Sequence, residues 1–238
     1  MAGAGGMMDN PAADGLQLWV DEEGIAHIVL DRDEKRNALS QPMIEAITAF
    51  ISGLDPASAG GFVHVVLITA RGSAFCAGAD LGVVRGDSHA YHAALEAMAA
   101  ALVACPLPVM ASVQGAAVGA GVELILGCDL VIAAPTAWFR VPPAVLGFAL
   151  DEWSVSTLVE MVGRRMAAEI LLSAAKIPAE RAQAAGLISR IGSDADALAW
   201  AREVAALAPL SLKQLKQLVH GEPFDQELYD EVWRLAQG

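Results

Sequence analysis

The chain has 238 residues, of which 55% are hydrophobic and only 18% are charged, so it can bury a large core and differs from disordered proteins. Its formal net charge of -13 disfavours nucleic acids and anionic membrane surfaces as partners, because the field of the protein would repel both. The most apolar region, about residues 109–134, is interrupted by polar and charged side chains and by glycines, so no membrane span is predicted.

A small anionic ligand remains compatible with this acidic composition if basic residues gather locally. Arg32, Lys35 and Arg36 form such a cluster, which is either a ligand contact or a solvated turn. Residues 1–15 lack both a basic segment and an apolar segment, which predicts a flexible tail and not a secretory signal. The cysteines are widely spaced, without a C-x-x-C pattern, and predict reduced, mostly buried thiols in the cytoplasm and no metal site: Cys76, Cys105 and Cys128.

Short segments rich in valine and isoleucine, bounded by glycine or charged residues, predict five strands at about 24–30, 62–69, 108–113, 130–134 and 186–191. Ser40, with Pro42 just inside, begins a periodic apolar run that predicts a capped amphipathic helix. Further helices are expected between the strands, at about 89–104, 119–127, 154–162, 166–173 and 179–185. The alternation implies parallel strands joined by right-handed crossovers, in sheets covered on at least one face.

From residue 194 onward the pattern becomes nearly continuous helix. The chain is therefore predicted to consist of a flexible tail (1–15), an α/β core (16–193) and a helical C-terminal module (194–238), with no sharp linker before the module.

The segment "GSAFCAGADL", residues 72–81, follows the second predicted strand and consists mainly of small residues. A tight turn of this kind brings backbone N–H groups close to a ligand, where bulky side chains would prevent the approach. Glycine and alanine also occur at such turns for packing reasons alone.

A second small-residue turn lies in "VQGAAVGAGVELILGCDL", residues 113–130. Ala120 and Glu123 are three residues apart, so they lie on nearly the same face of the predicted helix. An N–H group at a helix N-terminus beside a carboxylate could polarise a carbonyl while a proton moves. The alternative is that Glu123 only stabilises the first turn of its helix. A dinucleotide-binding fingerprint fails here, because after Gly119 and Gly121 the third glycine position is Leu124.

Four segments carry a resemblance to a known family: "RNALS" at 36–40, "FCAGADL" at 75–81, "GAGVEL" at 119–124 and "CDLVIAAPTAWF" at 128–139. In order and spacing they resemble the enoyl-CoA hydratase/isomerase, or crotonase, superfamily, over about residues 20–220. The resemblance implies an α/β spiral of β-β-α units with a helical C-terminal module, assembled as homotrimers or as hexamers. Members of this superfamily catalyse several reactions of acyl-CoA thioesters or merely bind them, so the reaction is less narrowly implied than the ligand.

The resemblance also implies roles for individual residues. The backbone N–H groups of Ala79 and Ala120 would form an oxyanion hole for the thioester carbonyl, and Glu123 matches a catalytic glutamate of the hydratases. Substrate-binding roles are implied for the basic pair and for the two small-residue segments near it: Lys35, Arg36, Ala38, Ala77, Asp80 and Leu81. The coenzyme A thioester is itself the ligand, and no metal or redox cofactor is implied. The histidines match no catalytic position of the family: His27, His64, His89, His92 and His220.

The sequence departs from the hydratase pattern at the second catalytic acid. Hydratases place a glutamate in "F-x-x-P-E-x-x-x-G", whereas this chain reads "FRVPPAVLG", with Pro143 at that position and no side chain that can exchange a proton. Asp151 matches a position at which some superfamily members place a functional aspartate, and we predict a desolvated acid facing Glu123. The alternatives are that Asp151 caps the helix beginning near Ser154, or that Ser154 caps it and Asp151 pairs with an arginine.

The sequence is compatible with two alternative functions. The first is an enzyme of fatty acid metabolism in the cytoplasm, nominally an enoyl-CoA hydratase, that uses Glu123 with Asp151 as a substitute acid. The second is a non-catalytic or weakly catalytic protein that binds fatty acyl-CoA and lacks the second glutamate. The chain stops at Gly238, earlier than is typical of the family, so CoA affinity or assembly is expected to differ.

Overall fold

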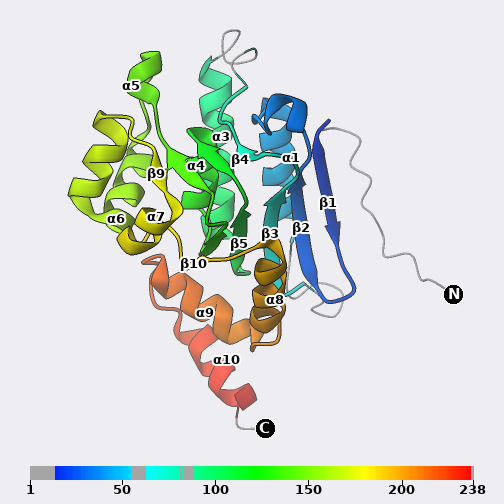
Figure 1. Ribbon diagram of the computed structural model, residues 1–238. Helices are drawn as coiled ribbons and strands as arrows, with labels where there is room; N and C mark the ends of the chain where they lie inside the picture. Colours follow the sequence, from blue (N-terminus) through cyan, green and yellow to red (C-terminus); the bar gives the residue numbers. More distant parts are fainter. Residues whose placement is uncertain (1–13, 55–62, 81, 83–87, 237–238) are drawn as a thin grey trace, which may run out of the picture.

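The computed structural model describes residues 14–54, 63–80, 82 and 88–236 (Figure 1). Its larger sheet has the strand order β1-β2-β3-β5-β7-β10, in which β1 is antiparallel to β2 and the other pairs are parallel. The strands are β1 (Leu16–Val20), β2 (Ile25–Leu30), β3 (Val65–Ala70), β5 (Val109–Val113), β7 (Leu130–Ala133) and β10 (Arg190–Ile191). The mixed α/β fold class predicted from the sequence is thus confirmed.

Each of the five predicted strands corresponds to a strand of this sheet, although the first residue of the second prediction, residue 62, lies outside the described residues. The last strand is shorter than predicted. Gly186 adopts a left-handed backbone conformation with φ 89° and ends α7 (Ala179–Ala185), so pairing with β7 begins only at Arg190. β1 was not predicted.

A second, four-stranded sheet has the order β4-β6-β8-β9 and was missed by the sequence analysis. Its strands are only two or three residues long: β4 (Ala74–Cys76), β6 (Ala116–Val118), β8 (Trp138–Arg140) and β9 (Ile177–Pro178). Segments this short show no alternating pattern. β4 and β6 are parallel, so the turns that follow them in the chain leave the sheet at the same edge.

The helices of the α/β part are α1 (Gln41–Ser52), α3 (Ser88–Ala104), α4 (Ala120–Leu126), α5 (Pro143–Leu146), α6 (Glu152–Leu172) and α7, with a short 3-10 helix, η1 (Asp33–Lys35). Ser40 lies at the N-cap of α1, but its side chain makes no capping hydrogen bond, contrary to the prediction. The two helices predicted at 154–162 and 166–173 correspond to the two parts of α6, which is interrupted at Gly163, with φ 74° and ψ 155°.

The larger sheet is buried on both faces, which explains why its strands read as nearly continuous apolar runs. Alternate residues of one strand face opposite ways: Val66 and Ile68 of β3 belong to the main core, whereas Val65 and Leu67 belong to a second cluster. Trp200 and Val204 of α8 (Asp194–Ala205) complete that second cluster. The first helix after residue 193 therefore packs directly on the sheet.

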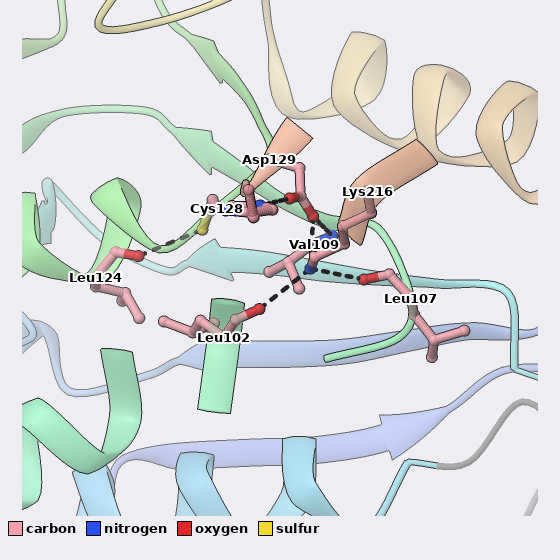
Figure 2. Close-up of polar contacts among 8 residues, drawn as sticks. Leu102, Leu107, Val109, Leu124, Cys128, Asp129 and Lys216 are labelled. Atoms are coloured by element: carbon pink, nitrogen blue, oxygen red, sulfur yellow. Dashed lines mark hydrogen bonds and ion pairs between the residues drawn. The ribbon is translucent and has the colours of Figure 1, made fainter. Parts of the chain in front are cut away.

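The chain ends in α9 (Pro209–Val219) and α10 (Gln226–Ala236), which extend from the end of the molecule opposite α5 (Figure 1). Lys216 of α9 is buried, and its Nζ lies 2.8 Å from Asp129 Oδ2 and donates to the carbonyl oxygens of Leu102 and Leu107 at 3.1 and 3.0 Å (Figure 2). A fully paired buried ammonium thus holds α9 against the core. The division of the chain at residue 194 stays a prediction, and the tail is described only from residue 14 onward.

Candidate active site

The segment that follows β4 is held by the segment that follows η1. Ala77 N donates to the carbonyl oxygen of Arg36 at 2.9 Å, and Leu39 N donates to the carbonyl oxygen of Gly78 at 2.8 Å. Asp80 N in turn donates to the carbonyl oxygen of Leu39 at 2.9 Å. These hydrogen bonds bring together two segments, 36–39 and 77–80, that contain most of the residues predicted to bind the substrate.

Asn37 fixes this arrangement and was not singled out by the sequence analysis. It is fully buried and has a left-handed conformation with φ 55°. Its Nδ2 donates to the carbonyl oxygens of Arg71 and Ala74, each at 2.8 Å, and its Oδ1 accepts from Arg32 N at 2.7 Å. Asparagine tolerates positive φ and can satisfy several backbone groups at once, which is the signal that "RNALS" contained.

The turn after β6 approaches the turn after β4 closely. Gly78 has φ 103°, and a Cβ atom there would lie 2.9 Å from the carbonyl oxygen of Val118 and 3.9 Å from Ala120 N. A Cβ atom on Gly121 would lie 2.7 Å from the Cβ atom of Cys76. Glycine at both positions is therefore required for α4 to begin so close to β4.

Ala79 and Ala120 both line one cavity. Ala120 is the first residue of α4, where an N–H group has no partner within the helix. In residues 14–54, 63–80, 82 and 88–236, neither N–H group donates to a backbone carbonyl. The cavity measures about 140 Å³ and adjoins a larger one of about 760 Å³; Leu95, Glu96, Glu123 and Asp151 line both.

Glu123 lies on α4, half-buried at the junction of the two cavities. The pKa of its carboxyl is raised from 4.5 to about 7, mainly by burial and also by the negative charge of Asp151, while His92 acts in the opposite direction. Its carboxylate has no hydrogen-bond partner among the residues described. Both protonation states of Glu123 are therefore accessible near neutral pH, as general acid–base chemistry requires.

Asp151 is the N-cap residue of α6. Its Oδ1 accepts from Ser154 N at 2.8 Å, and its Oδ2 accepts from Ser154 Oγ at 2.7 Å. The capping interpretation is thus correct, with the cap one residue before Glu152. Asp151 also lines both cavities and acts electrostatically on Glu123, so the two interpretations are compatible. Its chemical role stays a prediction.

The position at which hydratases carry their second glutamate is occupied by Pro143. Pro143 begins α5 and lines the smaller cavity, together with the apolar residues Leu146 and Phe148. The short helix therefore contributes an apolar surface beside Glu123.

The predicted substrate-binding residues fall into two groups. Ala77 lines the smaller cavity. Arg36, Ala38 and Asp80, on the paired segments, and Lys35, at the end of η1, are not part of its wall. Lys35 and Arg36 are exposed and Ala38 is half-buried. Asp80 forms an ion pair with Arg32, with Nη1 and Oδ2 2.9 Å apart, which accounts for part of the basic cluster. Leu81 lies outside the described residues.

Two cavity residues on α3 were missed. Tyr91 is buried, and its hydroxyl donates to the carbonyl oxygen of Leu39 at 3.0 Å. His92 lines the smaller cavity, and its Nδ1 lies within hydrogen-bond distance of the carbonyl oxygen of Ser88. The signal available was helical spacing, because His92, Leu95 and Glu96 lie three and four residues apart and share one face of α3.

The part of the chain that the structure describes contains no group of three or more histidine, cysteine, aspartate or glutamate side chains arranged to hold a metal ion. It also contains no helix that is both long enough and apolar enough to cross a membrane.

Comparisons with known proteins bear on this site. The model of the family described as "Enoyl-CoA hydratase/isomerase" matches residues 21–230. A protein of Mycobacterium tuberculosis named "Probable enoyl-CoA hydratase echA6" is 40% identical over 220 residues, which are 89% of this chain and 88% of that protein. A "Putative enoyl-CoA hydratase" of Thermus thermophilus is 35% identical over 217 residues, covering 87% of this chain and 84% of that protein.

Solved structures agree. An enoyl-CoA hydratase/carnithine racemase from Magnetospirillum magneticum superposes with a TM-score of 0.84 at 28% identity, over 95% of this chain and 89% of that one. A putative enoyl-CoA hydratase/isomerase family protein from Hyphomonas neptunium gives a TM-score of 0.82 at 29% identity, over 92% and 90%. The chain belongs to the enoyl-CoA hydratase/isomerase family of the crotonase superfamily.

Proposed function

We propose that this protein binds an acyl-CoA thioester and adds water to a trans-2-enoyl-CoA, with Glu123 as the acid–base group. The observation that carries the proposal is the placement of Glu123, with its pKa near neutrality, on the same small cavity as the Ala79 and Ala120 residues. Two free N–H groups beside an acid of this kind suit a reaction in which negative charge develops on a carbonyl oxygen.

In this proposal the thioester carbonyl accepts hydrogen bonds from Ala79 N and Ala120 N. Both donors are fixed by the short strands and close turns around them, so they need no reorganisation as charge develops. Removal of one such donor in other enzymes slows catalysis by roughly 10²–10³-fold, so the pair supports formation of an enolate.

Glu123 then moves the proton, while Asp151 orients the water. Each carboxylate oxygen of Asp151 already accepts one hydrogen bond from Ser154, and a carboxylate has about four acceptor positions in all. Asp151 therefore keeps the capacity to accept from a water molecule beside Glu123. Glu123 and Asp151 would thus together replace the pair of glutamates in the usual hydratase pattern.

The CoA moiety would lie along the paired segments 36–39 and 77–80. Lys35 and Arg36 are exposed where the first segment begins and would offset the repulsion between phosphate groups and a chain of net charge -13. No metal or redox cofactor takes part in the proposed reaction.

One observation favours a second function, the binding of fatty acyl-CoA without catalysis. Pro143 stands in the cavity wall where a hydratase would have its second glutamate, and it cannot exchange a proton. An acyl-CoA could still be held by the two N–H groups.

The test is the loss of enone absorbance when the protein is mixed with a short and a long trans-2-enoyl-CoA, together with calorimetric measurement of acyl-CoA binding. We expect turnover that is lost in Glu123→Gln, while binding remains. Binding without turnover in the wild type would instead support the second function. Absence of both would contradict the proposal as a whole.

We further propose action in cytoplasmic fatty acid metabolism as a homotrimer or hexamer. The helices α9 and α10 support an assembly, because they expose large apolar side chains, among them Trp233 at 52% and Leu235 at 62%. Light scattering on the eluting protein would give the mass of the assembly. A mass equal to that of the single chain would contradict this part of the proposal.

A further inference from the structure

Leu39 and Ala79 form an isolated parallel bridge between the two paired segments beside the smaller cavity. Leu39 N donates to the carbonyl oxygen of Gly78, and the carbonyl oxygen of Leu39 accepts from Asp80 N. In a bridge of this kind, the residue between the two bonded neighbours directs its own N–H and C=O groups to the opposite side. The N–H group of Ala79 is therefore turned away from Leu39, and the orientation of the Leu39 peptide sets its direction.

The carbonyl oxygen of Leu39 has a second donor, the hydroxyl of Tyr91. Tyr91 Oη lies 3.0 Å from this oxygen, and Asp80 N lies 2.9 Å from it. A carbonyl oxygen has two lone pairs, so the two donors use its full capacity. Leu39 has no exposed surface and Tyr91 is 1% exposed, so water does not compete for this bond. The plane of the Leu39 peptide is thus fixed from two directions.

Other side-chain contacts near this bridge involve other groups. Arg32 pairs with the carboxylate of Asp80 at 2.9 Å, and the Cys76 sulfur, a weak acceptor, lies 3.4 Å from Gly78 N. Neither contact reaches the carbonyl oxygen that Tyr91 contacts. The Tyr91 hydroxyl also comes from a separate element, α3, so it ties the bridge to a helix of the cavity wall.

Tyr91 lines the smaller cavity itself, so an alternative is that its hydroxyl supplies a proton to a bound ligand. The hydroxyl has one proton, and this proton is directed to the Leu39 carbonyl oxygen, because a carbonyl oxygen only accepts. Burial raises the pKa of the hydroxyl, so it stays protonated. Tyr91 is therefore a permanent donor to the bridge and not a source of protons.

We propose that Tyr91 is a positioning residue for the oxyanion hole: its hydroxyl, through the carbonyl oxygen of Leu39, fixes the direction of the N–H group of Ala79. The inference rests on the proposed function, in which this N–H group binds the thioester carbonyl oxygen. Oxyanion-hole donors are effective because they already point at the site where charge develops. Rotation of the Leu39 peptide would turn the N–H group of Ala79 away from that site.

Three replacements of Tyr91 separate the hydrogen bond from the packing of the ring. Tyr91→Phe removes the hydroxyl. 4-Methylphenylalanine at this position also lacks the donor but fills the space, whereas 4-aminophenylalanine fills the space and keeps a donor. Because these two differ little in volume, comparing them isolates the hydrogen bond even if Tyr91→Phe does not fold. The matched control is Tyr229→Phe, since Tyr229, the other tyrosine of the chain, lies on α10 and does not line this cavity.

The first measurement is the residual dipolar coupling of backbone N–H groups in the ligand-free protein, which reports the direction of each group. We expect the coupling of Ala79 to change in both variants without a donor and to return to the wild-type value with 4-aminophenylalanine. The couplings of β3 and those of Tyr229→Phe near the cavity should stay as in the wild type. An Ala79 coupling that is unchanged without the donor would overturn the inference.

The second measurement is the infrared stretch of the thioester carbonyl in carbon-13-labelled butyryl-CoA. We expect binding to wild type or to Tyr229→Phe to lower the frequency, and the donor-free variants to lose roughly half of this shift. For a trans-2-enoyl-CoA, kcat should fall about tenfold in them, with KM changed less than about twofold, because the N–H group acts mainly in the transition state.

The outcomes separate this inference from the proposed function. A purely structural role of Tyr91 would lower the midpoint of thermal unfolding but leave the carbonyl shift and kcat as in the wild type, which would overturn the inference. Absence of any carbonyl shift in the wild type would instead contradict the proposed function. The dipolar couplings would then still decide whether Tyr91 sets the direction of the Ala79 N–H group.

Discussion

Ala120 N lies 3.9 Å from the position that a Cβ atom would occupy on Gly78. The two turns that supply the cavity with free N–H groups are thus in contact through a residue without a side chain. A methyl group at position 78 would be in van der Waals contact with Ala120 N.

Gly78→Ala should therefore impair ligand binding as well as stability. The new methyl group would meet the carbonyl oxygen of Val118 at 2.9 Å, and alanine is strained at φ 103°. We expect a loss of about 1–3 kcal/mol in the free energy of unfolding and a fall in turnover of roughly 10²-fold or more. Gly221→Ala is the matched control, because Gly221 also has positive φ, 76°, but has open space around it. Equal effects of the two substitutions on turnover would contradict this account.

The raised pKa of Glu123 predicts how stability depends on pH. Between pH 4.5 and about 7 the folded protein holds a proton on Glu123 that the unfolded chain releases, so the free energy of unfolding falls as pH rises through this window. The shift corresponds to at most about 3 kcal/mol. Glu123→Gln should therefore be more stable than the wild type at about pH 8 and nearly equal to it at about pH 4, as measured by urea unfolding. Glu160→Gln, at an exposed position of α6, should show no such crossover.

Two substitutions separate the capping role of Asp151 from its charge. Asparagine is a good N-cap residue, so Asp151→Asn should keep the stability of α6, whereas Asp151→Ala should lose about 1 kcal/mol. Both remove a negative charge that raises the pKa of Glu123, so the acidic limb of the pH–rate profile should move to lower pH in both variants. A profile unchanged in Asp151→Asn would show that the charge does not reach Glu123.

The position of Pro143 offers a gain-of-function test. Pro143→Glu would place an acid in the cavity wall and at the first turn of α5, where a negative charge is favourable. If the missing acid limits hydration, turnover should rise by on the order of 10²-fold. Pro142→Glu, one residue earlier in the same wall, serves as the control for added charge. A rise of equal size in both variants would argue against a specific role for position 143.

The sequence predicted the elements whose pattern extends over many residues. Five of the six strands of the larger sheet were predicted, and β2 and β3 show why: burial on both faces makes them continuous apolar runs rich in valine and isoleucine. The smaller sheet was not, because each of its strands has only two or three residues, and β4 pairs with a segment about forty residues away. Pairing between segments so far apart leaves no pattern in the local sequence.

In the candidate site, too, sequence motifs identified some residues but did not reveal contacts between distant parts of the chain. Ala79, Ala120 and Glu123 were identified from motifs and do border one cavity. Asp80 pairs with Arg32, a contact between residues far apart in the chain that no motif indicates, and its assignment to substrate stays a prediction. His92 was passed over because an isolated histidine in an alanine-rich helix has no motif around it, and only the fold shows that it lines the same cavity as Glu123.

The ammonium of Lys216 has a consequence for chain truncation. Its acceptors come from the end of α3, from the loop that leads into β5, and from Asp129, which also accepts from Val109 N at 2.7 Å. α3 also carries Tyr91 and His92 in the cavity wall. Shortening the chain before α9 would leave carbonyl groups and a carboxylate buried without their shared cation, at the base of the helix that forms that wall. The last helices therefore help to hold the wall of the cavity in place. A shortened chain would keep the residues that act in the cavity but would lose the shape of the cavity.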